Sequence, residues 1–229
     1  MNKKGVLITI IVLLINIILY SEVRSYEEKT KNRVTTHNFV ISTSPSGYSI
    51  SLSSENKQEN THTDQKFELD TNLSAFSWQY ENSEEKTKVT ARREANNIFL
   101  DGIHKGKQIK KTYKINDLSW NQSFNIGLEK FALSKEKKLK FWAIGTSGSG
   151  DMKITKFSVK KKKAETIKID DKNVEAVHVE ISLSGLLSLF WTGHYWYHSV
   201  DGKFLRYRGK NKPGASITVM ELINVTDTE

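Results

Sequence analysis

The chain has 229 residues, a net charge of +9 at neutral pH and no cysteine. The absence of cysteine excludes a disulfide scaffold, a cysteine-ligated zinc site, a thiol nucleophile and a lipid-modified N-terminal cysteine. The basic residues gather in several short segments, and such charge attracts phosphates and acidic lipid headgroups. Since no nucleic-acid module is recognisable, we expect no nucleic-acid partner.

The first 25 residues have the pattern of an export signal. Lys3 and Lys4 precede an apolar run, Val6–Tyr20, and Val23 and Ser25 stand where a signal peptidase would read small residues. A charged start followed by an apolar stretch of about 7–15 residues is typical of exported proteins. We therefore predict an export signal over residues 1–25 and a single β-rich domain over residues 26–229.

The alternative for this segment is a membrane anchor that stays on the protein. A spanning helix needs about 20 apolar residues, and the run Val6–Tyr20 is short for that. Both interpretations place the domain in the periplasm or the outer envelope of a bacterium. They also allow membrane association through the N-terminal segment.

From Asn32 onward the first half of the chain alternates between apolar and polar residues, which predicts antiparallel strands. Pro45 and Gly47 mark a turn between the first two strands, whereas the polar stretch Ser53–Thr63 reads as a loose connection. Short connections favour hairpins over crossover helices. The strands expected here are Phe39–Ile41, Tyr48–Leu52, Phe67–Leu69, Ala75–Tyr80, Lys88–Arg93 and Gln108–Ile115.

The segment Ser119–Leu133 departs from this alternation. Trp120, Phe124, Leu128 and Phe131 recur at intervals of three and four residues, so they would lie on one face of a helix. We expect a short helix here that packs across the sheet.

The second half again predicts hairpins, and Asp201-Gly202 is a strong hairpin-turn signal. Further turns are expected at Gly145–Gly150, Asp170–Asn173 and Asn211–Gly214. The expected strands are Leu139–Ile144, Met152–Val159, Glu165–Ile169, Val174–Ile181, Tyr195–Ser199, Phe204–Arg208 and Ser216–Ile223. Together the elements predict a mainly β fold, an antiparallel curved sheet or half-barrel with one or two short helices.

None of the catalytic motifs that we tested is complete. The loop Gly145–Gly150 lacks the Lys and Ser or Thr of a Walker loop, and neither serine within it has both glycines of a nucleophile elbow. His194 and His198 lie on an expected strand, where four residues separate side chains by about 13 Å. We therefore predict a protein that is not an enzyme and has no cofactor and no metal site.

A dense aromatic segment is the best candidate for ligand binding. Tyr and Trp suit sites where one end of the ring is apolar and the other is wet, although core packing is an equally ordinary role for them. In a strand, Arg206 and Arg208 project to one face and Tyr207 to the other, so the arginines would reach an anionic headgroup only at the rim. The candidate residues are Trp191, Tyr195, Trp196, Tyr197, Arg206, Tyr207 and Arg208.

The order of these motifs resembles the uncharacterised bacterial "domain of unknown function 3108" family. The resemblance runs through Phe141-Trp142, Val174–Leu183, Tyr195-Trp196-Tyr197 and Asp201–Tyr207, and it is specific from about Lys140 to Gly209. It implies the architecture of the lipoprotein carriers LolA and LolB, in which an antiparallel sheet curls around a helical plug. It implies no catalytic residue.

We interpret the chain as an exported, non-enzymatic envelope protein that binds a lipid, an acyl chain or a lipoprotein in the concave face of its sheet. The alternative is a structural or assembly protein of the envelope that binds a protein partner. A continuous apolar cavity of about 300 Å³ or more would favour the first interpretation. A filled core with an exposed aromatic patch would favour the second.

Overall fold

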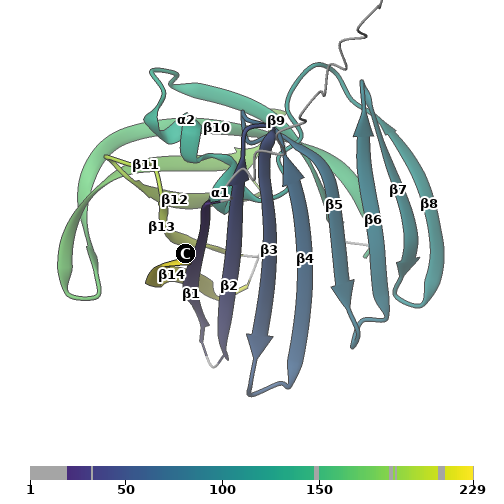
Figure 1. Cartoon of the computed structure of the whole chain (residues 1–229), viewed down its shortest axis with the longest axis horizontal. Helices are drawn as coiled ribbons and strands as arrows, with labels where there is room; N and C mark the ends of the chain where they lie inside the picture. Colours follow the sequence, from purple (N-terminus) through teal and green to yellow (C-terminus); the bar gives the residue numbers. More distant parts are fainter. Residues whose placement is uncertain are drawn as a thin grey trace, which may run out of the picture.

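The computed structural model describes residues 20–31, 33–146, 150–185, 188, 190–210 and 215–228. The apolar run before Tyr20 and the turn expected at Asn211–Gly214 therefore lie outside the described residues. Figure 1 shows a broad curved sheet with two short helices, α1 and α2, between its two halves.

The sheet has 14 antiparallel strands in the order β8-β7-β6-β5-β4-β3-β2-β1-β14-β13-β12-β11-β10-β9. Strands β1–β8 form one run of consecutive hairpins and β9–β14 form another, and the pairing of β1 with β14 joins the two runs. The prediction of a mainly antiparallel, curved sheet is confirmed. The strands are β1 (Tyr20–Thr30), β2 (Arg33–Ser44), β3 (Gly47–Asn56), β4 (Thr61–Leu69), β5 (Ala75–Asn82), β6 (Thr87–Glu94), β7 (Asn97–His104), β8 (Lys107–Lys114), β9 (Lys138–Thr146), β10 (Met152–Ile169), β11 (Lys172–Leu183), β12 (Thr192–His198), β13 (Phe204–Lys210) and β14 (Ile217–Thr228).

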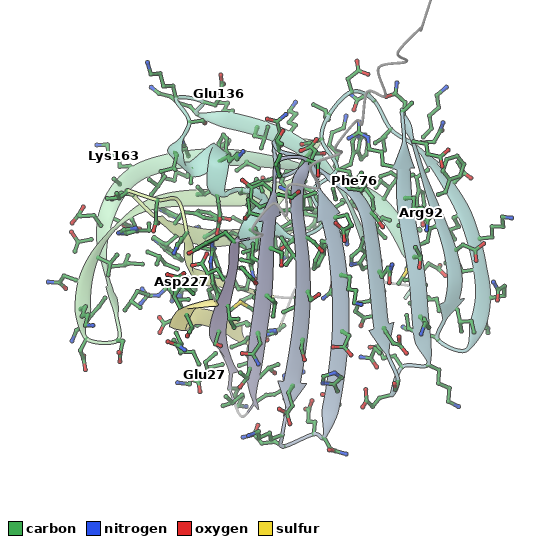
Figure 2. All side chains as sticks on the ribbon, viewed as in Figure 1. Glu27, Phe76, Arg92, Glu136, Lys163 and Asp227 are labelled. Carbon is green, nitrogen blue, oxygen red and sulfur yellow. The ribbon has the colours of Figure 1, made fainter. Side chains whose placement is uncertain are left out.

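The core lies on the concave side of the sheet, because alternate residues of each strand point to the same face. Buried apolar side chains of both halves meet there, among them Phe39, Phe67, Val179 and Phe204. The polar residues between them face outward. Figure 2 shows side chains projecting outward around the ribbon, with Arg92 on the outside of the sheet.

The helical segment is shorter than the sequence predicts. Helix α1 covers Phe124–Gly127 and α2 covers Glu129–Leu133, with a break at Leu128. Trp120 is not helical: it is buried and forms a β-bridge with Trp142 of β9. Gly127 explains why α1 can lie so near this bridge, since a Cβ atom there would sit 2.0 Å from the side-chain oxygen of Asn121.

Two other expectations are wrong in detail. The polar stretch Ser53–Thr63 is not a loose connection, because β3 and β4 pair as far as Asn56 and Thr61. The Asn56 side chain accepts hydrogen bonds from the backbone N–H groups of Gln58 and Glu59, each at 3.0 Å, and so forms the turn itself.

The two strands expected between Met152 and Ile169 are one long strand, β10, with an irregularity in its pairing between Lys161 and Ala164. Such a bulge bends a strand and increases its twist. Lys163 lies at this bend (Figure 2). Beyond the bend the outward face buries a second, smaller cluster that includes Ile167 and Leu205.

The sheet does not close into a barrel, and its two edges are β8 and β9. The backbone of Trp142 in β9 pairs with Ser119 and Asn121, so an irregular segment covers that edge. The hydroxyl of Tyr113 in β8 donates to the carbonyl of Met152 at 2.7 Å, which links this edge to β10, the neighbour of the other edge strand, without a strand pair. Covered or charged edges protect a sheet from pairing with other chains.

Strand β1 crosses the boundary that we predict between Ser25 and Tyr26. Residues Ser21–Ser25 pair with β2 on one side and β14 on the other. The folded sheet therefore begins at least as early as Tyr20. Whether the chain is cleaved stays a prediction.

Candidate functional site

The aromatic residues that we selected from the sequence fall on both faces of the sheet. Tyr195, Tyr197 and Tyr207 point inward and are buried. The rings of Tyr195 and Tyr207 lie 4.9 Å apart, and the Tyr197 hydroxyl donates to the carbonyl of Phe124 at 2.7 Å. Burial raises the pKa of Tyr207 to about 12, so its hydroxyl stays protonated. These three side chains fill the concave face beside α1.

Trp191 borders that space and packs against Phe157 of the core, whereas Trp196, Arg206 and Arg208 lie outside it. Trp196 and Arg206 face outward as a cross-strand pair, and Arg208 is exposed on the same strand as Arg206. Arg206 forms an ion pair with Glu221 at 2.6 Å. Trp191 is half-buried, and its indole N–H donates to the carbonyl of Lys210 at 2.7 Å.

Around Trp196 the outward face carries a small polar cluster. The Trp196 ring stacks on His178 with centroids 4.8 Å apart, and its indole N–H donates to Glu165. Nε2 of His178 lies 3.0 Å from Nδ1 of His194, and burial lowers the pKa of His178. His198 instead contacts Asp201 at 2.8 Å. No group of three potential metal ligands occurs among the described residues.

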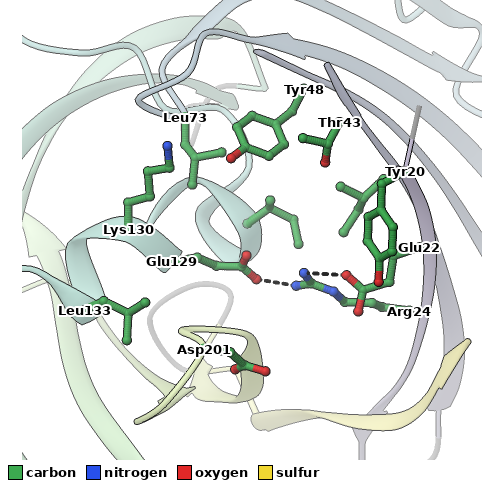
Figure 3. A pocket seen from close by; sticks show the side chains of 12 residues that line it. Tyr20, Glu22, Arg24, Thr43, Tyr48, Leu73, Glu129, Lys130, Leu133 and Asp201 are labelled. Carbon is green, nitrogen blue, oxygen red and sulfur yellow. Dashed lines mark hydrogen bonds and ion pairs between the residues drawn. The ribbon is translucent and has the colours of Figure 1, made fainter. Parts of the chain in front are cut away.

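An open cavity lies elsewhere, where β1 begins beside the helices (Figure 3). We call it the mouth cavity, and its volume is about 230 Å³. Strands β1–β3, the turn after β4, both helices and the turn between β12 and β13 contribute to its wall. Its lining residues are Tyr20, Glu22, Arg24, Ile41, Thr43, Tyr48, Leu73, Ile126, Glu129, Lys130, Leu133 and Asp201.

One wall of the mouth cavity is a buried ionic cluster centred on Arg24. The alternation of β1 turns Glu22 and Arg24 inward, and Arg24 is only 5% exposed. Its guanidinium bonds to Glu22 at 3.0 Å and also to Glu129 of α2, as the dashed lines in Figure 3 show. Lys203 completes the cluster with a 2.5 Å contact to Glu22. A buried charge needs such partners, because leaving water is costly for an isolated ion.

The cluster leaves one donor without a protein acceptor. Nε of Arg24 is buried and has no hydrogen-bond partner among the described residues. Buried donors in proteins are nearly always satisfied by protein, ordered water or a ligand. Nε itself has almost no exposed surface, so a molecule in the cavity would contact the cluster through its exposed atoms.

The two carboxyl groups of the cluster titrate differently. Burial raises the pKa of Glu129 to about 7, despite hydrogen bonds from Arg24 and from the backbone N–H of Phe204. Burial also disfavours the charged form of Glu22, but hydrogen bonds from Arg24 and Lys203 outweigh it and lower the pKa. The charge of the cavity wall thus changes near neutral pH through Glu129.

The remaining wall of the mouth cavity is largely apolar. Ile41, Leu73 and Ile126 are buried around it, and Leu133 lies at its open side. Lys130 lies with its ammonium 5.6 Å from the ring centre of Tyr48. The cavity therefore combines an apolar surface with charged groups, an arrangement that suits an amphipathic molecule.

No family model and no curated protein matches the chain. The resemblance to the "domain of unknown function 3108" family and to the lipoprotein carriers therefore stays a prediction.

Two solved structures are similar to the chain over most of its length. One is the hypothetical lipoprotein YmcC from Escherichia coli, with 12% identity, a TM-score of 0.41, and 90% of this chain and 84% of that chain covered. The other is a DUF1329 family protein from Desulfovibrio piger, with 11% identity, a TM-score of 0.29, and 91% and 85% covered. At these values neither structure assigns a role to any residue of this chain.

Further hollows occur among the described residues, and two of them lie along the sheet. A groove of about 580 Å³ on the outer face of β2–β6 is lined mostly by polar side chains, including Asn38, Asp64 and Gln79. A cavity of about 170 Å³ between β5 and the strands β9 and β10 includes Trp78 and Gln122. Neither contains a buried ionic cluster like that of the mouth cavity.

The sequence analysis missed Glu22, Arg24 and Glu129. The first two lie in the segment assigned to the export signal, and Glu129 lies on the expected helix without any special spacing. One signal was available: Tyr20, Glu22, Arg24 and Tyr26 alternate with smaller residues, as in a strand. Within the part of the chain that the structure describes, no helix could span a membrane.

Proposed function

We propose that this protein is a non-enzymatic binding protein of the cell envelope that holds the end of a single acyl chain in the mouth cavity. The chain would belong to a lipid or a lipoprotein. The observation that carries the proposal is an open cavity with an apolar wall beside a buried ionic cluster. The export pattern of the first 25 residues supports the envelope location.

The apolar wall supplies the attraction for the chain. Each methylene group moved from water into such surroundings contributes about 0.8 kcal/mol. The buried side chains Ile41, Leu73 and Ile126 already hold their positions in the core, so little ordering is needed on binding. A preformed cavity of this kind favours a slender, flexible apolar group.

The charged wall supplies the polar contact. An ester or carboxylate oxygen would lie near Arg24, which lines this wall between Glu22 and Glu129. Lys130, on the rim, could reach a headgroup outside the cavity. The ligand would then lie with its tail against the apolar wall and its oxygen atoms against the cluster.

The size of the cavity restricts the ligand. Whole small-molecule sites usually span about 300–1,000 Å³, and the mouth cavity has about 230 Å³. A complete two-chain lipid would not fit. We therefore propose that only a chain end enters and that the rest of the molecule stays outside.

A photoreactive fatty acid tests this proposal on the full chain in lipid nanodiscs. In wild type we expect crosslinks on the residues that line the mouth cavity. Thr43→Trp fills the cavity from β2 and should abolish these crosslinks. Ser42→Trp is the matched control, because Ser42 is the next residue of the same strand and faces the other side. Crosslinks that are absent from the cavity, or that persist in Thr43→Trp, would contradict the proposal.

The outer groove favours a second candidate, the envelope assembly protein. Its volume of about 580 Å³ and its exposed hydrogen-bonding side chains suit an extended polar partner, such as a segment of another protein. Changing Asn38, Asp64 and Gln79 together to alanine should then abolish recovery of a defined envelope partner after crosslinking in cells. The same variant should keep the fatty-acid crosslinks of the mouth cavity.

A further inference from the structure

Strand β1 restricts where the exported chain can be cut. Removal of residues 1–25 would take away Glu22 and Arg24, and Glu129 would remain buried without its ionic partner. It would also unpair β2 and β14 along Ser21–Ser25. Loss of one partner from a buried ion pair is strongly destabilising. The folded protein therefore needs β1 intact from at least Glu22 onward.

The sequence offers no cleavage site that spares this strand. A signal peptidase site needs small residues at its end, and the run Val6–Tyr20 contains no Ala, Gly or Ser. The first small residues after the run are Ser21 and Ser25. Ser21 has Leu19, not a small residue, two positions before it, and a cut after Ser25 would remove Glu22 and Arg24. The structural need for β1 and the lack of an earlier site point to the same result, an apolar segment that stays attached.

The attached segment leaves the folded domain at the mouth cavity. Tyr20, the first described residue, lines that cavity and is 51% exposed. An extended residue spans at most about 3.6 Å, so an anchor that ends near Tyr20 would hold the cavity within a few ångströms of the bilayer.

Further exposed apolar side chains surround the same opening. Leu133 at the end of α2 is 48% exposed and lines the cavity. Val200 is 79% exposed and directly precedes Asp201, which lines the cavity too. Exposed apolar side chains close together are typical of surfaces that contact a partner or a membrane.

The charge near the opening suits a bilayer with anionic lipids. Lys130 and Asp201 both line the opening, and beyond α2 the exposed Lys135, Lys137 and Lys138 outnumber Glu136, their one acidic neighbour in sequence. Lysine side chains near a membrane surface are attracted to anionic headgroups by about 1 kcal/mol each.

We propose that the opening of the mouth cavity docks on the surface of a lipid bilayer, held there by the uncleaved segment before Tyr20. Tyr20, Leu133 and Val200 contact the lipid, and the lysines after α2 face the headgroups. This orientation does not depend on whether the cavity binds an acyl chain.

The N-terminus is tested first, on protein purified from the membrane fraction of cells that express the full chain. Intact mass and N-terminal sequencing should give a chain that starts before Tyr20. A mature chain that begins anywhere from Glu22 to Tyr26 would overturn the proposal.

The orientation is tested with single cysteines, which the cysteine-free chain makes unambiguous. Leu133→Cys and Val200→Cys report on the opening, whereas Phe99→Cys and Ile103→Cys report on β7 and have similarly exposed side chains, 41% and 44%. Each variant carries an environment-sensitive fluorophore and is reconstituted into vesicles of phosphatidylcholine and phosphatidylglycerol.

A quencher attached to the lipid chains should reduce the emission at residues 133 and 200 and leave residues 99 and 103 unchanged. Equal quenching at all four positions, or none at the opening, would overturn the docking proposal. All four positions are exposed, so the substitutions leave the core intact. Because no fatty acid is added, a negative result here is distinct from a failure of the crosslinking experiment on the mouth cavity.

Discussion

Two regions of the concave face differ sharply although they touch. The aromatic sector, which we define as Tyr195, Tyr197, Phe204 and Tyr207, is filled, apolar and uncharged. The mouth cavity is open and carries the Arg24 cluster. The backbone N–H of Phe204 donates to Glu129 at 3.1 Å, so the two regions meet at one residue.

The contrast shows what a dense aromatic pattern means in this chain. Aromatic residues concentrated in one segment identify the part of the sheet that packs against the helical plug, as with Tyr197 and Phe124. The open site instead draws its residues from β1, β2 and α2, which are distant in sequence. The aromatic segment that packs the core can be recognised from neighbouring residues in the sequence. The mouth cavity forms only when segments distant in sequence pair and pack.

Tyr197→Ala should have the largest effect on stability. Truncation of a fully buried aromatic residue costs about 3–5 kcal/mol, and loss of its donor to the Phe124 carbonyl adds about 1 kcal/mol. Denaturant unfolding measures the loss, and Tyr197→Phe should lose only the hydrogen-bond part. A cost below about 1 kcal/mol for the alanine variant would show that the sector is not packed as described.

Arg24→Met should be the next most costly change, by about 3–5 kcal/mol, because it leaves Glu22 and Glu129 buried without their shared partner. The matched control is Arg206→Met, which breaks a more exposed pair with Glu221 and should cost about 1 kcal/mol or less. If both variants unfold at the same denaturant concentration, the Arg24 cluster contributes no more to stability than a surface ion pair does.

The pH dependence of stability should report on the mouth cavity, because Glu129 titrates there. Its pKa is about 7 in the folded protein against an ordinary 4.5, so the folded state binds more protons than the unfolded state between these values. The free energy of unfolding should therefore fall as pH rises through that window, by about 1–3 kcal/mol.

Glu129→Gln should remove this fall. Subtracting its pH profile from that of wild type cancels the contributions of other groups, such as His178, whose lowered pKa acts in the opposite direction. Glu22→Gln is the control of opposite sign, because a lowered pKa contributes stability that is lost as pH falls. Parallel pH profiles for wild type and Glu129→Gln would show that Glu129 is charged throughout.

Trp196→Ala should have the smallest effect, about 1 kcal/mol, although it lies between Tyr195 and Tyr197 in the sequence. It removes an outward stacking contact with His178, the bond to Glu165 and contacts with the smaller outward cluster of Ile167 and Leu205, but no packing in the main core. The melting temperature should fall by about 2–4 °C. A loss as large as that of Tyr197→Ala would mean that the outward face of β12 is buried by something else.

The sequence predicted the architecture well because strand periodicity and turn residues are local. Asp201-Gly202 forms the expected turn, with Gly202 at a φ of +76°. The helix was overestimated because Trp120 has helical spacing but pairs with Trp142 of a later strand. Of the five aromatic candidates, Trp196 lies outside the main core because alternation separates it from Tyr195 and Tyr197, and the sequence alone does not say which face is concave.

The mouth cavity could not be predicted for a related reason. Glu22 and Arg24 follow an apolar run whose targeting pattern is itself a strong signal, and their partner Glu129 lies more than a hundred residues away. Only the pairing of β1 with β14 and the packing of α2 bring them together. Ion pairs between residues so distant in sequence produce no repeating pattern from which they could be predicted.

The pairing of β1 with β14 also sets the order of events when the chain folds. Strand β1 lies between β2, its neighbour in sequence, and β14, which ends at Thr228. Contacts so distant along the chain form slowly, since a long loop must close first. Hairpins of the first half can form early, but one edge of β1 stays unpaired until the last strand arrives. For a chain that crosses a membrane from its N-terminus, folding is complete only after the whole chain has been released.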